Sequence, residues 1–236
     1  GSNIADLTLI IGLAILVGRG IKVSSESIKK NMKIMILIAT IPIVLMIIGK
    51  SLSRIDGIIL LAVFALYLIS LFKESWFYVN QIDEDQRKHI HSKTKYSLSK
   101  NLRISFNNYL VFLLCIGLLF GSAWTLTTSA KQLSIDLGFP EILVGLIIVA
   151  IGTSLPELTF QTKSILEKHE NMALGNVFGS VINNSTIVLG IGALINPIQT
   201  NLILFFTSAL FMLLFAFLFM ALITSKHGIN WKDAMT

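Results

Sequence analysis

The sequence predicts an all-α membrane protein, a polytopic bundle of transmembrane helices, and three observations support this fold class. Hydrophobic residues make up 54% of the 236 residues and charged residues only 14%, whereas a soluble domain carries about 25% charged residues. The apolar residues gather in blocks close to the ~20 residues that span a bilayer as a helix. Most Lys and Arg residues lie between these blocks, where they orient a membrane protein.

Seven apolar blocks predict seven transmembrane helices. The first three blocks are short, so we expect their helices to extend into the polar residues that flank them, or the bilayer to thin around them. In chain order the predicted spans are 4–18, 34–49, 57–72, 109–130, 142–162, 172–195 and 202–223.

Lys and Arg residues divide unequally between the two sets of connections. Sixteen of the 19 lie in 19–33, 73–105, 163–170 and 224–236, and three lie in the alternate connections. Because positive residues favour the cytoplasmic side, the first set is predicted to be cytoplasmic. The chain would then start outside and end inside. Its compact connections suit a prokaryotic inner (plasma) membrane.

The basic character of the chain is a topology signal here. A net charge of +6 and a pI of about 9.5 would favour nucleic-acid binding in a soluble protein. In this chain the positive charge lies in the connections, so the expected macromolecular environment is the lipid bilayer and no nucleic acid. The four histidines also lie in connections, and Cys115 is the single cysteine. These features argue against an intramembrane hydrolase or metalloprotease, so we expect neither an enzyme nor a resident cofactor.

Two segments of the chain resemble each other. Residues 1–17 and 179–195 are identical at six of 17 aligned positions. On the predicted topology, the first segment runs from outside to inside and the second runs the opposite way. Repeats of opposite orientation are typical of transporters whose substrate site lies near the membrane midplane, between the repeats.

Two ionisable residues, Asp6 and Glu157, fall inside predicted spans. Such residues are costly in a membrane and usually mark a functional site. Ala150, Thr153 and Ser154 precede Glu157 at spacings that place all four on one helix face. Hydroxyl, carbonyl and carboxylate oxygens are ligands for Ca²⁺ or Na⁺, and they suit Zn²⁺ or copper poorly.

Pro156 should interrupt this helix. Proline lacks an N–H group and clashes with the carbonyl four residues earlier, here that of Gly152. Unpaired carbonyl oxygens are tolerated in a membrane only inside protein or where they line a cavity. We therefore expect a break between Gly152 and Pro156 that faces the span 172–195.

A second polar group lies on that span. Ser180 and Asn184 are one helical turn apart and share a face, and Ser2 and Asp6 occupy the equivalent places in the first repeat. The sequence therefore predicts one oxygen-rich site built from both repeats.

These motifs carry a family resemblance. Residues 152–157, GTSLPE, together with residues 175–180, GNVFGS, resemble the second alpha-repeat of the sodium/calcium exchangers in the calcium:cation antiporter superfamily. The resemblance implies an inverted-repeat fold of ten helices in two halves, of which this chain would be a fragment that supplies helices three to nine. On that template, 1–72 is the end of the first half, 73–105 a cytoplasmic linker and 106–236 the second half, truncated before its last helix.

The resemblance also implies roles for individual residues. In the family, the Glu of the first motif is a central ligand of Ca²⁺ and Na⁺, and neighbouring oxygens complete the site. Many members place Asn on the third helix and Asp on the eighth, whereas this chain has Asp6 and Asn184. The implied ion-site residues are Glu157, Ser154, Thr153, Ala150, Ser180, Asn184, Asp6 and Ser2.

The expected function is secondary active antiport of Ca²⁺ against Na⁺ by alternating access, with both ions transported rather than resident. An alternative is a Ca²⁺(cation)/H⁺ antiporter of the same superfamily, because burial disfavours the charged form of a carboxylate and lets it carry a proton. A seven-span receptor or a non-transporting membrane subunit is a remoter alternative, in which the inverted repeat has no evident use.

Overall fold

The computed structural model describes residues 1–22, 26–81, 102–199, 202–225 and 228–230. The chain forms two units, one made of residues 1–66 and 142–236 and the other of residues 67–141. Helices account for nearly all of the described residues. In the first unit they are α1 (Ser2–Ala5), η1 (Asp6–Ile10), α2 (Ile11–Gly18), α3 (Glu26–Gly49), the first half of α4 (Arg54–Gln81), most of α7 (Glu141–Val144), η2 (Gly145–Val149), α8 (Ala150–Thr153), α9 (Leu155–Leu166), α10 (Glu170–Asn183), η3 (Asn184–Val188), α11 (Leu189–Ile195) and α12 (Leu202–Ser225).

Each of the seven predicted spans is helical. Within the described ranges, five helices are long and apolar enough to cross a membrane. The other two predicted spans are the shorter helical run Ser2–Gly18 and the interrupted run from α7 to α9. The predicted extension into polar flanks is also present, since α3 begins at Glu26, well before the apolar block at 34. The prediction of a polytopic helical membrane protein is therefore confirmed.

The second unit holds the end of α4 and helix α6 (Leu102–Leu137). Side chains 108–129 of α6 are exposed, among them Leu118 and Phe120. A long apolar helix with this exposure suits contact with lipid. The predicted linker 73–105 is partly helical, because α4 continues to Gln81 and α6 begins at Leu102. Its middle lies outside the described residues.

Helix α4 begins with a local capping arrangement. The backbone N–H and hydroxyl groups of Ser53 both donate to Oδ2 of Asp56, at 2.8 and 2.7 Å. The N–H of Asp56 donates back to the Ser53 hydroxyl at 3.3 Å. Such reciprocal bonds satisfy amide groups that a helix start leaves unpaired.

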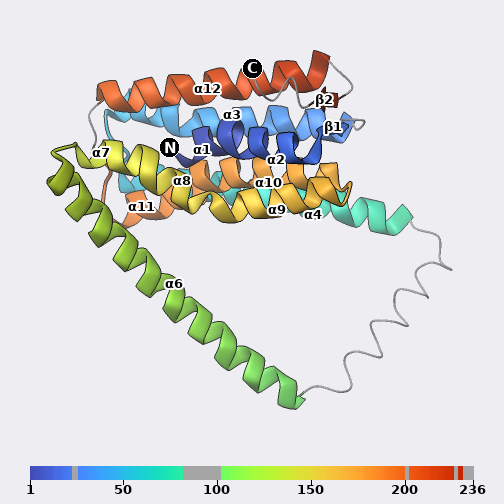
Figure 1. The fold of residues 1–236 in the computed structure, drawn as a ribbon, viewed down its shortest axis with the longest axis horizontal. Helices are drawn as coiled ribbons and strands as arrows, with labels where there is room; N and C mark the ends of the chain where they lie inside the picture. The colour runs from blue at the N-terminus through green and yellow to red at the C-terminus, as the bar shows by residue number, and fades with distance from the viewer. Residues whose placement is uncertain (23–25, 82–101, 200–201, 226–227, 231–236) are drawn as a thin grey trace. The chain divides into compact units, whose positions relative to one another are not determined.

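The two copies of the repeat run in opposite directions. Figure 1 shows α1 and α2 running one way and α10 and α11 running the other. Each copy contains a π-helical turn, Asp6–Ile10 in the first and Asn184–Val188 in the second. Adding 178 to a number in the first copy gives its counterpart in the second, since 6 becomes 184 and 10 becomes 188. The π-turns therefore occupy equivalent positions.

A threonine accompanies each π-turn. Thr8 donates to the carbonyl of Ile4 at 2.6 Å, and its counterpart Thr186 donates to the carbonyl of Ile182 at 2.6 Å. π-turns disturb the regular helical hydrogen-bond pattern and are frequent at functional sites. The repeated hydroxyl supplies an additional donor to a carbonyl one turn back.

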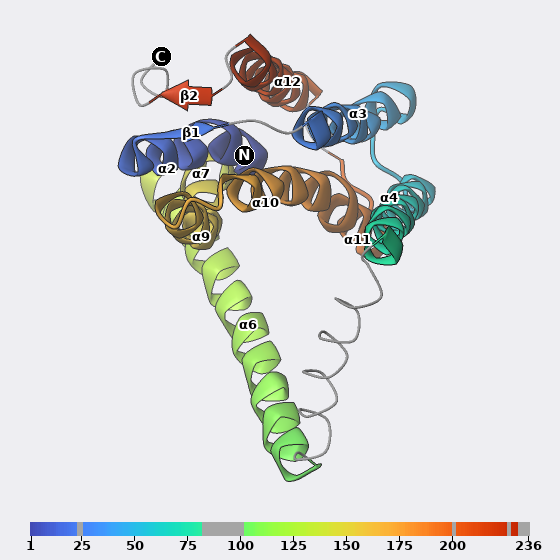
Figure 2. The same ribbon diagram turned by 90° about the vertical axis from the view of Figure 1, so that its right-hand side faces the viewer.

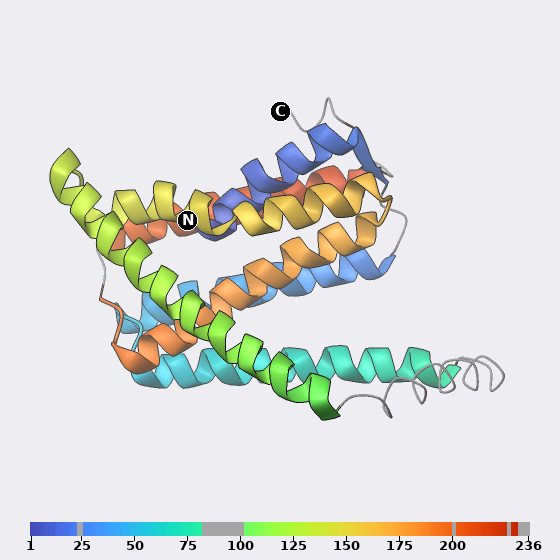
Figure 3. The same cartoon turned by 60° about the horizontal axis from the view of Figure 1, so that its bottom comes forward.

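Two small backbone bridges connect the copies at their ends. Strand β1 (Gly20–Lys22) pairs antiparallel with β2 (Gly228–Asn230), placing Gly20 opposite Asn230. Leu52 pairs with Ile198 through two hydrogen bonds of 3.0 and 2.9 Å. The same offset of 178 converts the first pair into the second, because 20 becomes 198 and 52 becomes 230. Figure 3 shows the α9–α10 connection at the β1 end, with the α3–α4 connection and the end of α11 at the other end.

Helix α10 is at the centre of the first unit. Figure 2 shows it between α9 and α3, and both helices contact it. Its side chains Leu174, Val177 and Ile182 are almost completely buried. The first unit contains residues from both predicted halves, because the two copies pack against each other. The division of the chain into the end of a first half (1–72), a linker (73–105) and a second half (106–236) remains a prediction.

Candidate cation site

The helical run that carries Glu157 is interrupted at the predicted place. Helix α8 ends at Thr153 and α9 begins at Leu155, and Ser154 between them has φ −94° and ψ 1°, outside the helical region. Pro156 lies in the first turn of α9, where its missing N–H costs no helical hydrogen bond. The break lets the buried Ser154 side chain join the polar residues of the first repeat copy.

The start of the first copy packs closely on this run. The Ser2 and Ser154 hydroxyl oxygens are 3.0 Å apart. A Cβ atom on Gly1 would lie 2.7 Å from the carbonyl oxygen of Leu146 and 2.8 Å from Cβ of Ala150. Only glycine fits at this contact, which brings Ser2 within hydrogen-bonding distance of Ser154.

Two hydrogen bonds between the copies are symmetry counterparts. The Ser180 hydroxyl donates to Oδ2 of Asp6 at 2.6 Å. Nδ2 of Asn184 donates to the Ser2 hydroxyl at 3.4 Å. The offset of 178 exchanges Ser2 with Ser180 and Asp6 with Asn184, so one bond maps onto the other. The predicted correspondence between these four residues is thus present in their contacts.

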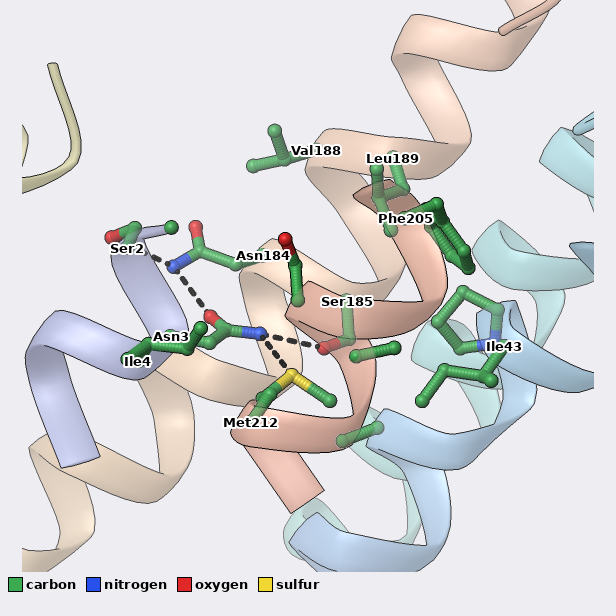
Figure 4. Close-up of a pocket in the computed structure, with 15 residues that line it drawn as sticks. Ser2, Asn3, Ile4, Ile43, Asn184, Ser185, Val188, Leu189, Phe205 and Met212 are labelled. Carbon is green, nitrogen blue, oxygen red and sulfur yellow. Dashed lines mark hydrogen bonds between the residues drawn. The ribbon is translucent and has the colours of Figure 1, made fainter. Parts of the chain in front are cut away.

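A third polar residue of the first copy extends the network. Oδ1 of Asn3 accepts a 3.0 Å hydrogen bond from Asn184, while Nδ2 of Asn3 donates at 3.0 Å to Ser185 and at 3.5 Å to the sulfur of Met212. Figure 4 shows these residues along one side of a pocket. The cavity has a volume of about 290 Å³, and apolar residues such as Phe205 complete its wall.

Three buried oxygen atoms have no hydrogen-bond partner among the described residues. They are Oδ1 of Asp6, Oε2 of Glu157 and Oε1 of Gln161. An unpaired buried acceptor is unfavourable, and a buried carboxylate is more so. All three atoms are hydrogen-bond acceptors, so a cation or a donor would satisfy them, and the two carboxylates could also be satisfied by a proton. In the described part of the chain, no three His, Cys, Asp or Glu side chains come together, so neutral oxygens would have to complete a cation's coordination.

The structure brings together most of the predicted site residues. Ser2, Asp6, Ser154, Ser180 and Asn184 lie in contact across the repeats, as the hydrogen bonds above show. Glu157 lies one turn beyond Ser154 on the same run and contributes a buried oxygen.

Thr153 and Ala150 are placed differently. The Thr153 side chain is exposed, and its hydroxyl donates to the carbonyls of Val149 and Ala150 at 2.9 and 3.1 Å. The Ala150 carbonyl also accepts the Ser154 N–H at 3.2 Å. In this conformation both groups are therefore occupied by bonds within their own helical run.

Sequence reasoning did not assign site roles to three polar residues that the structure buries or connects: Asn3, Ser185 and Gln161. Asn3 follows the repeated Gly-Ser pair, and this position could have indicated it. Gln161 follows Glu157 by one helical turn, which was an available signal. Ser185 had no such signal, since only the contact with Asn3 identifies it.

Comparison with known proteins agrees with this geometry. The sequence model described as "Sodium/calcium exchanger protein" matches residues 1–73 and 107–236. The chain belongs to the sodium/calcium exchanger protein family. It is therefore part of a family of transporters. Among similar proteins, the putative antiporter CaxA of Alkalimonas amylolytica is 33% identical over 198 residues, which cover 84% of this chain and 59% of that protein.

Two further similar proteins are a curated relative and a solved structure. The inner membrane protein YrbG of Escherichia coli is 33% identical over 199 residues, covering 84% of this chain and 58% of that protein. A solved structure of the sodium-calcium exchanger NCX_Mj matches with a TM-score of 0.63 and 25% identity, covering all of this chain and 69% of that one. The chain thus spans somewhat more than half the length of CaxA and YrbG.

Proposed function

We propose that this chain supplies most of the cation site of an antiporter that exchanges Ca²⁺ for Na⁺ across a membrane by alternating access. The observation that carries the proposal is the pair of buried, unpaired carboxylate oxygens, Oδ1 of Asp6 and Oε2 of Glu157. They come from different helical runs that meet through Ser2 and Ser154. Two buried carboxylate oxygens that no donor satisfies suit an ion that arrives and leaves.

The chemistry of the neighbouring groups supports Ca²⁺ and Na⁺. Hydroxyls of Ser2, Ser154 and Ser180 and the amide of Asn184 form a hydrogen-bonded network that includes Asp6, and Glu157 follows Ser154 by three residues. These groups provide neutral oxygens. Ca²⁺ accepts flexible oxygen coordination, whereas Mg²⁺ dehydrates reluctantly. Negative charge at the site would be neutralised either by one Ca²⁺ or by several Na⁺ ions. Competition of the two ions for the same charge would couple their transport in opposite directions.

Proton coupling is the second candidate, and the same two oxygens favour it. A proton on Asp6 or Glu157 would satisfy a buried acceptor as well as Na⁺ would. The two candidates differ only in the ion that replaces Ca²⁺ on the return step.

The test is ⁴⁵Ca²⁺ uptake into vesicles containing the natural gene product. An outward Na⁺ gradient should drive uptake, and Glu157→Gln should reduce it to less than about a tenth, the change that 1.4 kcal/mol of lost stabilisation produces. Glu167→Gln is the matched control, because Glu167 is an exposed carboxylate at the end of the same helix. Uptake driven only by a pH gradient would favour the proton-coupled function, and unchanged uptake by Glu157→Gln would refute the proposed site.

The proposal also assigns one end of the first unit to the cytoplasmic side of the membrane. Arg19 and Lys22 follow α2, and Lys163 and Lys168 lie at the end of α9 and just after it. Figure 1 shows β1 and the turn between α9 and α10 at the same end of the first unit. Positive residues favour the cytoplasmic face. We therefore assign this end to the cytoplasm, with the protein in the inner membrane of a prokaryote.

A further inference from the structure

A second layer of polar side chains lies beside the proposed site. Gln161 on α9 is completely buried, with 0% of its surface exposed. Its Nε2 donates a hydrogen bond of 3.3 Å to Oδ1 of Asn176 on α10, and its Oε1 has no partner among the described residues. The buried Gln161 amide therefore connects α9 to α10 by a hydrogen bond, while its oxygen has no hydrogen-bond partner among the described residues.

The layer has a defined place along the helices. Gln161 follows Glu157 by four residues, and Asn176 precedes Ser180 by four residues, so each pair shares a helix face. Helix α9 runs from Glu157 towards the α9–α10 connection, and α10 runs back from it. The Gln161–Asn176 layer thus lies one turn closer than the site to the end that we assign to the cytoplasm.

The chemistry of this layer differs from that of the site. A buried carboxylate oxygen without a donor can be satisfied when the group takes up a proton. The amide of Gln161 is neutral and takes up no proton near neutral pH. Its oxygen can be satisfied only by a donor or a cation. Ca²⁺ sites in proteins depend on carboxylates for their affinity. A layer with amide oxygens and no carboxylate would therefore hold a monovalent cation briefly and Ca²⁺ poorly.

We propose that Oε1 of Gln161 is a transient binding station for partly dehydrated Na⁺ on its path between the cytoplasm and Glu157. This inference rests on the proposed antiport function and adds a ligand outside the predicted site. The oxygen replaces part of the ion's hydration shell one helical turn before the charged site. Asn176 fixes the orientation of the Gln161 amide through their hydrogen bond, and so acts as a positioning residue.

The test uses Gln161→Met in the natural gene product, in vesicles that expose either face to the assay solution. Methionine keeps the length of the side chain and removes both polar atoms. The Na⁺ concentration for half-maximal exchange should rise about three- to tenfold at the cytoplasmic face, the range expected for one lost neutral contact. It should stay unchanged at the opposite face. The shape-preserving Gln161→Glu should lower that concentration at the cytoplasmic face and slow turnover, because a charged station releases the ion slowly.

Two variants separate ion binding from a structural role. Asn176→Ala removes the bond between the helices but keeps the Gln161 oxygen, so its effect on Na⁺ should be smaller than that of Gln161→Met. Thr159→Val is the control on the same helix, since the Thr159 side chain is exposed and its hydroxyl donates back to the carbonyl of Leu155, at 3.1 Å. If Asn176→Ala and Gln161→Met change the Na⁺ concentration for half-maximal exchange equally at both faces, the Gln161–Asn176 hydrogen bond has only a structural role. That result would refute the proposed Na⁺ station at Gln161.

The outcomes also distinguish this inference from the proposed function. If Gln161→Met and Gln161→Glu both show unchanged Na⁺ dependence while Glu157→Gln is inactive, the station is wrong and the site stands. If Glu157→Gln transports normally, the site itself is wrong.

Discussion

The Ser180 hydroxyl lies 2.6 Å from Oδ2 of Asp6, although 174 residues separate them in the chain. This bond leaves the other carboxylate oxygen of Asp6 buried and unpaired. The counterpart of Asp6 in the second copy is Asn184, whose amide donates to Ser2. The two copies therefore share one geometry but place the negative charge on one side of the symmetry axis.

Exchanging the two residues tests whether total charge or its position matters. Asp6→Asn alone removes a charge and should lose much of the Ca²⁺ transport. The double change Asp6→Asn with Asn184→Asp restores the number of carboxylates and should retain substantial transport, because the Ser2 hydroxyl can donate to the carboxylate introduced in the second copy as Ser180 donates to Asp6. The measurement is ⁴⁵Ca²⁺ uptake driven by an outward Na⁺ gradient.

Two results would change this interpretation. Equal inactivity of the single and double variants would show that the position of the charge is decisive. Normal transport by Asp6→Asn would remove Asp6 from the cation site. Ser53→Ala is a useful reference, since it removes a hydroxyl that bonds a carboxylate, at 2.7 Å, outside the site.

Gly57 should be intolerant of a larger side chain. A Cβ atom there would lie 2.7 Å from the carbonyl oxygen of Gly190, where α4 and α11 touch. Gly57→Ala should lower the free energy of unfolding by about 1–3 kcal/mol, the usual cost of overpacking. Thermal unfolding in detergent would measure it. Gly192→Ala is the matched control on α11, because its Cβ would make only an ordinary 3.6 Å contact; equal stability of the two variants would refute the close packing.

Cysteines at positions 52 and 198 should form a disulfide. The paired backbones of Leu52 and Ile198 exchange two hydrogen bonds, which sets their Cα atoms about 5.5 Å apart, within disulfide range. In a Cys115→Ser background, the double variant should lose both free thiols on mild oxidation and should unfold at a higher temperature. Each single-cysteine variant should keep its free thiol, which a maleimide would label after the protein is unfolded in denaturant, since Leu52 is completely buried in the folded chain. Persistence of two free thiols would show that this bridge is absent in the membrane.

Labelling from outside the cell should distinguish the two ends of the first unit. His169 is exposed in the α9–α10 connection, and Gln199 is exposed after α11. With Cys115 replaced by serine, an impermeant thiol reagent should label Gln199→Cys in intact cells and His169→Cys only after the membrane is opened. The reverse pattern would invert the assigned orientation.

The sequence predicted the helices well because lipid imposes a simple rule on length and hydropathy. It also located the break near Pro156, since proline acts on its own helix. It did not indicate that Thr153 would donate to Val149, because a hydroxyl on a helix can bond outwards or back along its own turn. The end bridges were also absent from the prediction, since Leu52 and Ile198 are ordinary residues whose pairing depends on backbone positions far apart in the chain.

The constant offset of 178 residues has a consequence for how the lengths of the two copies can change in evolution. It relates the two π-turns and also the two end bridges, although a connection and a long helix lie between these features in each copy. The two copies therefore differ by no net insertion or deletion over this distance. An insertion in one connection alone would move an end bridge relative to the site in only one copy. The two copies would then differ in length. Selection on these connections is therefore expected to act on their length more strictly than on their amino acids.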